Sequence, residues 1–153
     1  MPTAAQSDQR LPTADPLELL IGRERIGNPL EIFQLIETGI PITNAVRALS
    51  ELDLMGNQQV LSKIIGMSQR ALLRRAQFAD KALNPTLSSR LLTFVKILRQ
   101  AELVFGTRQR ATKWITEPAL GLEKYPPIDL LTNPQGAEIV WDFLARIEYG
   151  VYQ

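Results

Sequence analysis

The chain of 153 residues contains no cysteine and no histidine. Without cysteine it has no disulfide, no thiolate nucleophile and no cysteine-based zinc site. Without histidine it lacks the Ser-His and Cys-His nucleophile systems, the usual general base near neutral pH and the commonest metal ligand. These absences predict a protein that is not an enzyme, with no catalytic residue, no metal and no cofactor.

Long apolar runs are also missing. No stretch approaches the roughly 18–20 apolar residues that are needed to cross a bilayer. The first 16 residues are polar and have no apolar core flanked by basic residues, so they do not form a secretory signal. Because a hydrophobic fraction of 45% is ordinary for a globular protein, we expect a folded cytoplasmic protein of one domain or two small ones, without a membrane partner.

Charge is segregated along the chain. Ten basic and only two acidic residues lie between Gln58 and Arg110, which gives this block a charge of +8, whereas residues 1–57 carry −4 and residues 111–153 carry −3. The net charge of +1 hides this division. The basic residues are Lys63, Arg70, Arg74, Arg75, Lys81, Arg90, Lys96, Arg99, Arg108 and Arg110. Such a block attracts a polyanion, and DNA is the first candidate.

Capping residues, prolines and glycines predict an all-α fold. Asn28-Pro29 is an N-cap followed by proline at the first helical position, and Thr43 is expected to cap another helix. Asn84-Pro85 breaks the chain before a long helix, and Thr132-Asn133-Pro134 starts the last one. Helices are expected over about 29–38, 43–54, 58–65, 69–79, 85–105, 108–116 and from 134 to Gly150. No alternating strand pattern longer than four residues occurs.

These boundaries predict three parts. Residues 1–27 are expected to be a flexible N-terminal arm, because the first 16 have no period and contain three prolines. Within that arm, residues 17–27 are ambiguous between a strand, a turn of helix and an adhesive arm. Residues 28–106 are expected to form a helical DNA-binding domain with a long connecting helix, and residues 107–153 a C-terminal domain.

Residues 58–77 have the order of a helix-turn-helix. A first helix would end at Gly66, where glycine tolerates a left-handed turn, and a second would begin after Ser68. Met67, Leu72 and Leu73 are expected to face the core. Gln and Arg side chains have the bidentate geometry that adenine and guanine edges require. The predicted DNA-binding residues are Ser68, Gln69, Arg70, Arg74 and Arg75. One alternative is that the arginine-rich face of this helix is only solvated. The charge does not exclude RNA as the partner, but no aromatic residues lie among the arginines to stack on the bases of a single strand.

The C-terminal end is acidic and aromatic. From Ala111 onward it holds six of the ten aromatic residues, and aromatic and apolar residues continue to the terminus. Chain ends are usually polar, and Tyr and Trp are common interface anchors. Tyr149, Val151 and Tyr152 are therefore candidates for a partner contact. The residues expected to face the protein's own core are Trp114, Ile139, Val140, Phe143, Leu144 and Ile147.

Two stretches resemble a known family. The run Leu61-x-x-Ile64-Ile65-Gly66-Met67-Ser68-x-Arg70-Ala71-Leu72-x-Arg74-Arg75 looks like the helix-turn-helix of Xre-type antitoxins. It is followed by Ala111-x-x-Trp114-Ile115-x-x-Pro118, by Pro127-x-x-Leu130-Leu131-Thr132, and by Gly136, Val140, Leu144, Arg146-Ile147 and Gly150-Val151. This order, over roughly residues 58–152, is similar to the Xre/MbcA/ParS antitoxin family, and its half from the tryptophan to the terminus is the more specific.

The resemblance implies a type II antitoxin of a RES–Xre toxin–antitoxin system. Its C-terminal domain would cover the active site of a RES-domain toxin that degrades NAD. The helix-turn-helix would bind operator DNA and repress the operon, as a homodimer within a larger toxin–antitoxin complex that is nucleoid-associated when bound to DNA. The toxin-binding residues implied are Trp114, Arg146, Tyr149, Gly150, Val151 and Tyr152.

Two alternatives differ in class from an antitoxin. One is a stand-alone helix-turn-helix regulator whose C-terminal domain dimerises or binds a small ligand. The other is an enzyme that uses the carboxylates of the C-terminal end, which are Asp129, Glu138, Asp142 and Glu148. The enzyme is disfavoured because Glu138 and Asp142 fall where a solvated helix face would place them.

Overall fold

A computed structural model describes residues 15–22, 28–78 and 80–150, and it confirms the all-α fold class. In chain order the helices are α1 (Pro16–Ile21), α2 (Pro29–Thr38), α3 (Ile42–Glu51), α4 (Gln58–Val60), the π-helical turn η1 (Leu61–Ile65), α5 (Gln69–Ala76), α6 (Pro85–Phe105), α7 (Arg108–Thr116), the 3-10 turn η2 (Leu120–Leu122), α8 (Pro127–Leu130) and α9 (Pro134–Glu148). The only extended pairing among these residues is an isolated bridge between Pro41 and Ala82.

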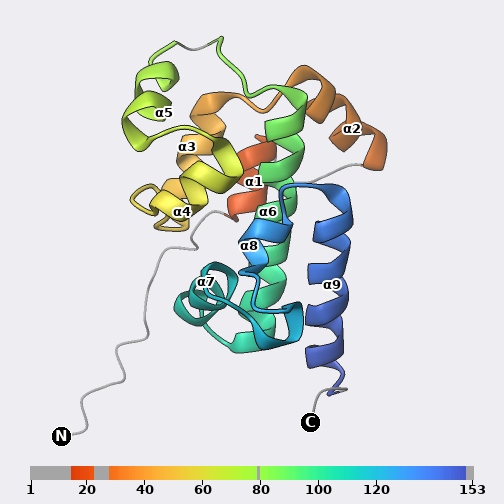
Figure 1. Cartoon of the computed structure of the whole chain (residues 1–153). Coiled ribbons are helices and arrows are strands. Elements are labelled where there is room, and N and C mark those ends of the chain that lie inside the picture. Colours follow the sequence, from red (N-terminus) through yellow and green to blue (C-terminus); the bar gives the residue numbers. More distant parts are fainter. Residues whose placement is uncertain (1–14, 23–27, 79, 151–153) are drawn as a thin grey trace, which may run out of the picture.

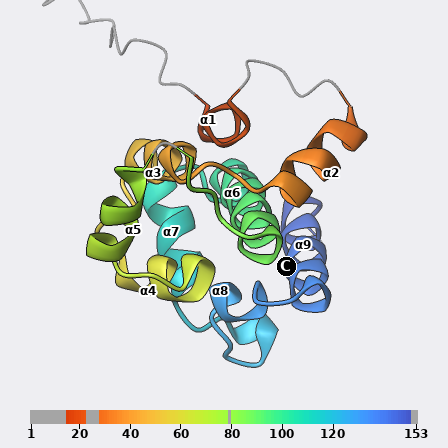
Figure 2. The same cartoon turned by 90° about the horizontal axis from the view of Figure 1, so that it is seen from above.

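Helix α6 is the central element (Figure 1). The Asn84 side chain caps it by accepting a hydrogen bond from the Leu87 N–H at 2.8 Å, and left-handed Gly106 ends it. Helices α1, α2, α7 and α9 and the turn η1 all contact α6. Seen from above, α3, α4 and α5 lie on one side of α6 and α9 lies on the other (Figure 2). Apolar residues are buried on several faces of α6, as expected for a helix in the middle of a fold.

One hydrophobic cluster runs through both predicted domains. Its buried members extend from Leu17 in α1 to Leu144 in α9. The parts at residues 28–106 and 107–153 therefore share a core across α6, and the boundary between them stays a prediction. None of the helices in the described ranges combines the length and apolar character that crossing a bilayer requires.

Helix α1 corrects the prediction of a flexible arm. The Asp15 side chain caps this helix, and Leu17 and Leu20 are buried against α3 and α6. An ion pair of 3.0 Å joins Asp15 to Arg99, and the Asn44 amide donates a hydrogen bond to the Leu20 carbonyl. Residues 15–22 are therefore part of the fold, and of the three alternatives for residues 17–27 the turn of helix is the one observed as far as Ile21, because contacts distant in sequence stabilise this short helix. Residues 1–14 and 23–27 lie outside the described part of the chain.

The start of α3 differs from the prediction. The helix begins at Ile42, after Pro41, and no side chain caps it, so Thr43 is not its N-cap. The Ile42 N–H instead donates to the Lys81 carbonyl at 3.0 Å, beside the bridge to Ala82. Because the loop before α6 satisfies this first N–H, a capping side chain is not needed there.

Candidate functional site

The turn before α5 is built as the sequence predicted. Gly66 is left-handed, with φ of 70°, and its N–H closes η1 by donating to the Leu61 carbonyl at 2.8 Å. The Ser68 hydroxyl then accepts a hydrogen bond from the Ala71 N–H at 3.1 Å and caps α5. Met67 packs against the core, and Leu72 is fully buried. Four residues thus orient α5 on the rest of the fold.

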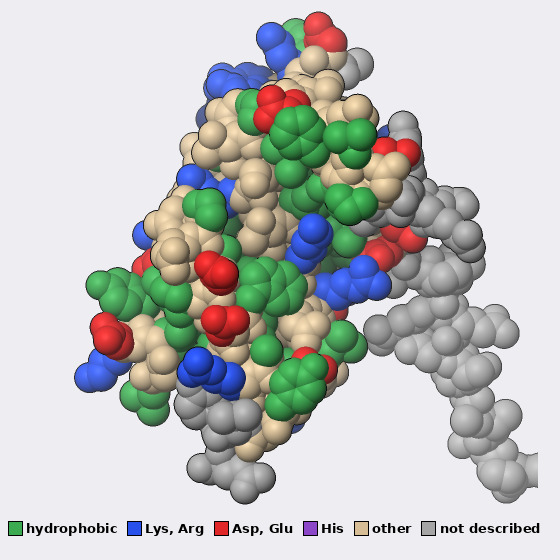
Figure 3. Space-filling model, turned by 90° about the vertical axis from the view of Figure 1, so that its right-hand side faces the viewer, with side chains coloured by type: hydrophobic (Ala, Val, Ile, Leu, Met, Phe, Trp, Pro, Cys, Tyr) green, Lys and Arg blue, Asp and Glu red, His purple; other side chains and the backbone are tan. Residues whose placement is uncertain are grey.

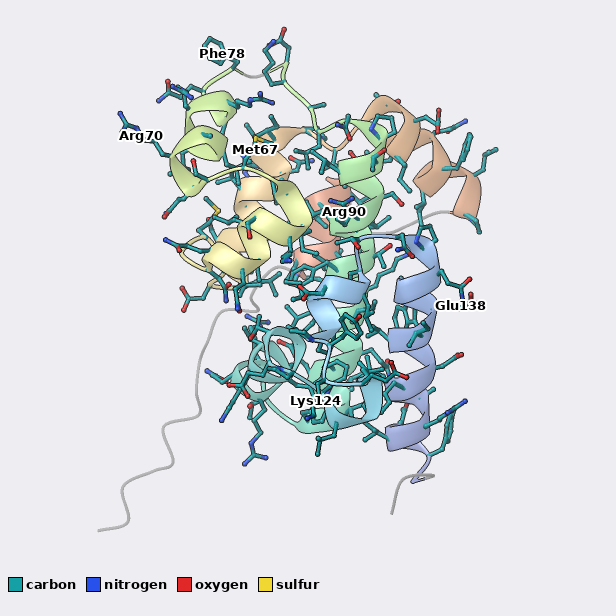
Figure 4. The ribbon with its side chains drawn as sticks, in the orientation of Figure 1. Met67, Arg70, Phe78, Arg90, Lys124 and Glu138 are labelled. Carbon is teal, nitrogen blue, oxygen red and sulfur yellow. The ribbon has the colours of Figure 1, made fainter. Side chains whose placement is uncertain are left out.

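The outer face of α5 carries four residues at helical spacing. Arg70, Leu73, Arg74 and Gln77 occupy positions i, i+3, i+4 and i+7, and with Gln69 they line a hollow to which no other element contributes. Arg70 points away from the body of the molecule (Figure 4). Leu73 is 44% exposed, so the expectation that it faces the core is wrong. The reason is geometric, since successive helical positions differ by about 100° and only the Leu72 position faces inward.

The tertiary structure divides the basic block into paired and free charges. Ion pairs join Lys63 to Asp129 at 3.3 Å, Arg99 to Asp15, and Arg108 to Glu102. By contrast, Arg70, Arg74 and Arg75 are exposed, and their side chains have no ion pair or hydrogen bond within the described residues. Three exposed arginines without partners therefore lie together on α5, while the other residues of the block without an ion pair or side-chain hydrogen bond in this part of the chain, Lys81, Lys96 and Arg110, lie on separate segments.

Arg90 connects the two ends of the molecule. Its guanidinium donates hydrogen bonds to the Lys63 carbonyl in η1 at 3.4 Å and to the Thr132 carbonyl before α9 at 3.3 Å. The Lys63–Asp129 ion pair runs beside it from η1 to α8. Figure 4 shows Arg90 in the middle of the molecule, between the two halves. The helix before α5 is thus held directly by the segment that leads into α9.

Trp114 lies inside an aromatic stack. Its ring is 5.2 Å from that of Phe105 and 6.0 Å from that of Phe143, and it is nearly parallel to the latter at 5°. Gly121 lies so close to this stack that a Cβ there would be 2.1 Å from Phe143. Trp114 is half-buried and joins α6, α7 and α9, which agrees with the expected core role and leaves a toxin contact untested.

The last turn of α9 exposes other predicted toxin-binding residues. Arg146, Tyr149 and Gly150 are exposed, and the Tyr149 side chain reaches 80%. Val151 and Tyr152 lie outside the described residues. Ile139 is 43% exposed, so its expected inward position is wrong. The buried stripe of α9 is formed by Ala137, Val140 and Leu144, and Ile139 is turned away from it.

A groove that the sequence did not predict lies between α2, the start of α6 and α9. Its volume is about 730 Å³, and its lining includes Ile36, Glu37, Arg90, Thr132, Glu138 and Trp141. Figure 3 shows this side of the molecule, where hydrophobic side chains lie among acidic and basic ones. The feature of the sequence that could have indicated this groove is the amphipathic helix α2. None of its residues is buried, and Leu30 and Phe33 are exposed.

The described residues form an all-α protein with two separate exposed surfaces. The basic helix α5 lies at one end, and the end of α9 lies at the other (Figure 1). Residues 100–150, from the end of α6 to the end of α9, match the model of the antitoxin Xre/MbcA/ParS C-terminal toxin-binding domain. This match and the curated relatives support an antitoxin of the Xre/MbcA/ParS type, as the resemblance suggested.

Three curated relatives of the chain are each named antitoxin Xre. The chain is 34% identical over 88 residues to an antitoxin Xre of Yersinia enterocolitica, covering 57% of the chain and 59% of that relative. It is 27% identical over 139 residues to an antitoxin Xre of Photorhabdus laumondii, covering 90% and 91%. A third antitoxin Xre, from Pseudomonas putida, is 32% identical over 71 residues, which is 46% of the chain and 45% of the relative.

Proposed function

We propose that this antitoxin neutralises a RES-domain toxin that degrades NAD, by covering the active site of the toxin with its C-terminal domain. We also propose that it represses its own operon by binding operator DNA through α5. The observation that carries the proposal is the match of residues 100–150 to a toxin-binding domain, at the end of the molecule opposite the free arginines of α5. Two partners could then be bound at once.

Covering a cleft needs shape, aromatic anchors and a few polar contacts, and it needs no catalytic group. The exposed Tyr149 and Arg146 on the last turn of α9 offer an aromatic and a cationic contact of this kind. Together with Trp114, Gly150, Val151 and Tyr152 they are the proposed toxin-binding residues. A cover of this sort acts without chemistry, which is consistent with a non-enzymatic protein.

The toxin half of the proposal is tested by co-expression with a RES-domain toxin from the same operon. The intact chain should restore growth and cellular NAD, whereas Arg146→Ala/Tyr149→Ala should weaken the complex by tenfold or more, as expected when interface anchors are removed. Tyr125→Ala is the matched control, because Tyr125 is 54% exposed and is not a proposed contact. If the intact chain neither binds the toxin nor preserves NAD, a stand-alone regulator becomes the better explanation.

The DNA half rests on the unpaired arginines of α5 and on the capped turn that orients them. Each phosphate contact contributes about 0.9 to the slope of log affinity against log salt. Arg70→Ala/Arg74→Ala should therefore lower both the affinity for the operator and this slope, while toxin neutralisation is unchanged. Arg110→Ala/Lys113→Ala is the control, because it removes the same charge from α7, at the opposite end of the molecule. This variant should change neither the affinity for the operator nor the salt slope.

We further propose that the chain binds its operator as a homodimer, since helix-turn-helix proteins usually read paired half-sites. Sedimentation of the protein with operator duplex should give two chains per operator.

The variant Arg70→Ala/Arg74→Ala decides the role of α5. If it binds the operator as tightly as the intact chain, α5 is not the DNA-binding element.

A further inference from the structure

We infer that Leu73 contacts the C5-methyl group of a thymine in the major groove of the operator, and is thus a specificity-determining residue. The inference rests on the proposed DNA binding by α5. Its starting point is the exposure of Leu73, at 44%, in the centre of a stripe whose other members are the polar residues Arg70, Arg74 and Gln77.

Among the described residues, the hollow that contains Leu73 belongs to α5 and the residue after it. Its five lining residues all come from this segment, whereas the neighbouring Leu72 is fully buried in the core. Single exposed leucines are common on protein surfaces. What distinguishes Leu73 is its position among unpaired cationic and amide groups that are suited to base edges.

The chemistry of the major groove selects the contact. Guanine, cytosine and adenine present hydrogen-bonding groups there, whereas thymine also presents an apolar methyl group. Residues three or four positions apart lie about one helical turn, or 5.4 Å, from each other. Arg70 and Gln77 therefore flank Leu73 by about one turn on either side, so that these three residues can meet neighbouring base pairs.

A second copy of this chain fits the same surface poorly. In a twofold contact between two α5 faces, Arg70 and Arg74 of one chain would approach the same arginines of the other, because such an interface repeats one patch on both sides. Like charges without partners would oppose that contact. The same arginines favour a polyanion, and under the proposed function this polyanion is the operator DNA.

The test replaces each operator thymine in turn by deoxyuridine, which lacks only the C5-methyl group. For the intact chain, one position in each half-site should lower affinity about three- to fivefold, the cost of one apolar group that is no longer buried. For Leu73→Ala, binding to the natural operator should weaken, and the same uridine should cost nothing further, since the two changes remove one contact. Leu103→Ala, a 75% exposed leucine on α6, should behave like the intact chain.

The outcomes separate the inference from the proposed function. If the intact chain binds the operator but no uridine weakens it, or if the uridine costs the same in Leu73→Ala, then Leu73 does not read a methyl group and DNA binding stands. If Leu73→Ala instead dissociates a dimer and leaves the uridine response intact, the residue serves a contact between copies. If the intact chain prefers the operator no more than random DNA, both proposals fail.

Discussion

The buried hydroxyl of Ser88 is expected to be a major contributor to the stability of this fold. Ser88 is fully buried in the first turns of α6. Its Oγ accepts a hydrogen bond from the Ile40 N–H at 2.9 Å and donates one to the Leu83 carbonyl at 3.2 Å. One hydroxyl therefore joins the loop between α2 and α3 to the segment before α6.

The substitution Ser88→Ala removes this hydroxyl and leaves the Ile40 N–H without a partner in the protein interior. An unsatisfied buried donor costs about 1–3 kcal/mol. The same substitution gains up to about 0.7 kcal/mol from the higher helix propensity of alanine. Ser89→Ala is the matched control, because Ser89 is the next residue in α6 and is exposed. Both variants share the helix-propensity gain, so the difference between them measures the hydrogen bonds.

We expect Ser88→Ala to be less stable than Ser89→Ala by about 1–3 kcal/mol. For a chain of this length that corresponds to a Tm lower by roughly 2–12 °C. Urea unfolding followed by circular dichroism and tryptophan fluorescence gives the free energy of unfolding, and the dependence on urea should be the same in both variants. If the two variants unfold at the same urea concentration, the hydroxyl does not hold these loops and the reasoning from its hydrogen bonds is refuted.

Two further substitutions test the packing at either end of the molecule. Leu20→Ala should destabilise the protein by about 2–5 kcal/mol, because Leu20 is fully buried in α1, whereas Leu30→Ala, at a 62% exposed position, should cost under about 0.5 kcal/mol; equal stability of the two would show that α1 is not part of the core. Gly121→Ala should cost about 1–3 kcal/mol, because the new Cβ would overlap the Phe143 ring, whereas Gly56→Ala places its Cβ in open space. Thermal unfolding of both glycine variants checks this, and no difference between them would contradict the close contact.

Helix boundaries were the most predictable feature of this chain. The three Asn-Pro pairs each begin a helix, at Pro29, Pro85 and Pro134. These signals work from sequence because a cap and the N–H groups that it satisfies lie within about three residues. Ends without a glycine or proline were predicted less well: α3 ends at Glu51 and α5 at Ala76, both about three residues before the predicted ends.

The sequence by itself leaves helix α1 as one of three alternatives and does not decide among them. The helix has only six residues, too few to show a helical period. Its contacts with α3 and α6, including the Asp15–Arg99 ion pair, join residues that are far apart in the chain. An isolated helix of this length is unstable in water, so tertiary packing decides whether it forms.

The candidate sites were predictable in location and less so in detail. The turn at Gly66 and the exposed arginines of α5 follow from local glycine, capping and charge patterns. The outward position of Leu73 does not, because a leucine beside a buried leucine is compatible with either face until the axis of the helix is placed. The groove between α2 and α9 also needed the tertiary structure, since it joins residues from the two ends of the chain.

The sequence by itself determined the helical class, most helix starts, the segregation of charge and the family to which the C-terminal end belongs. Only the tertiary structure decided which charges remain available. It pairs Lys63, Arg99 and Arg108 with carboxylates of other segments and leaves the arginines of α5 without partners among the described residues. The physical reason is range: caps and turns depend on neighbours in the chain, whereas an ion pair depends on neighbours in space, which exist only once the helices have packed.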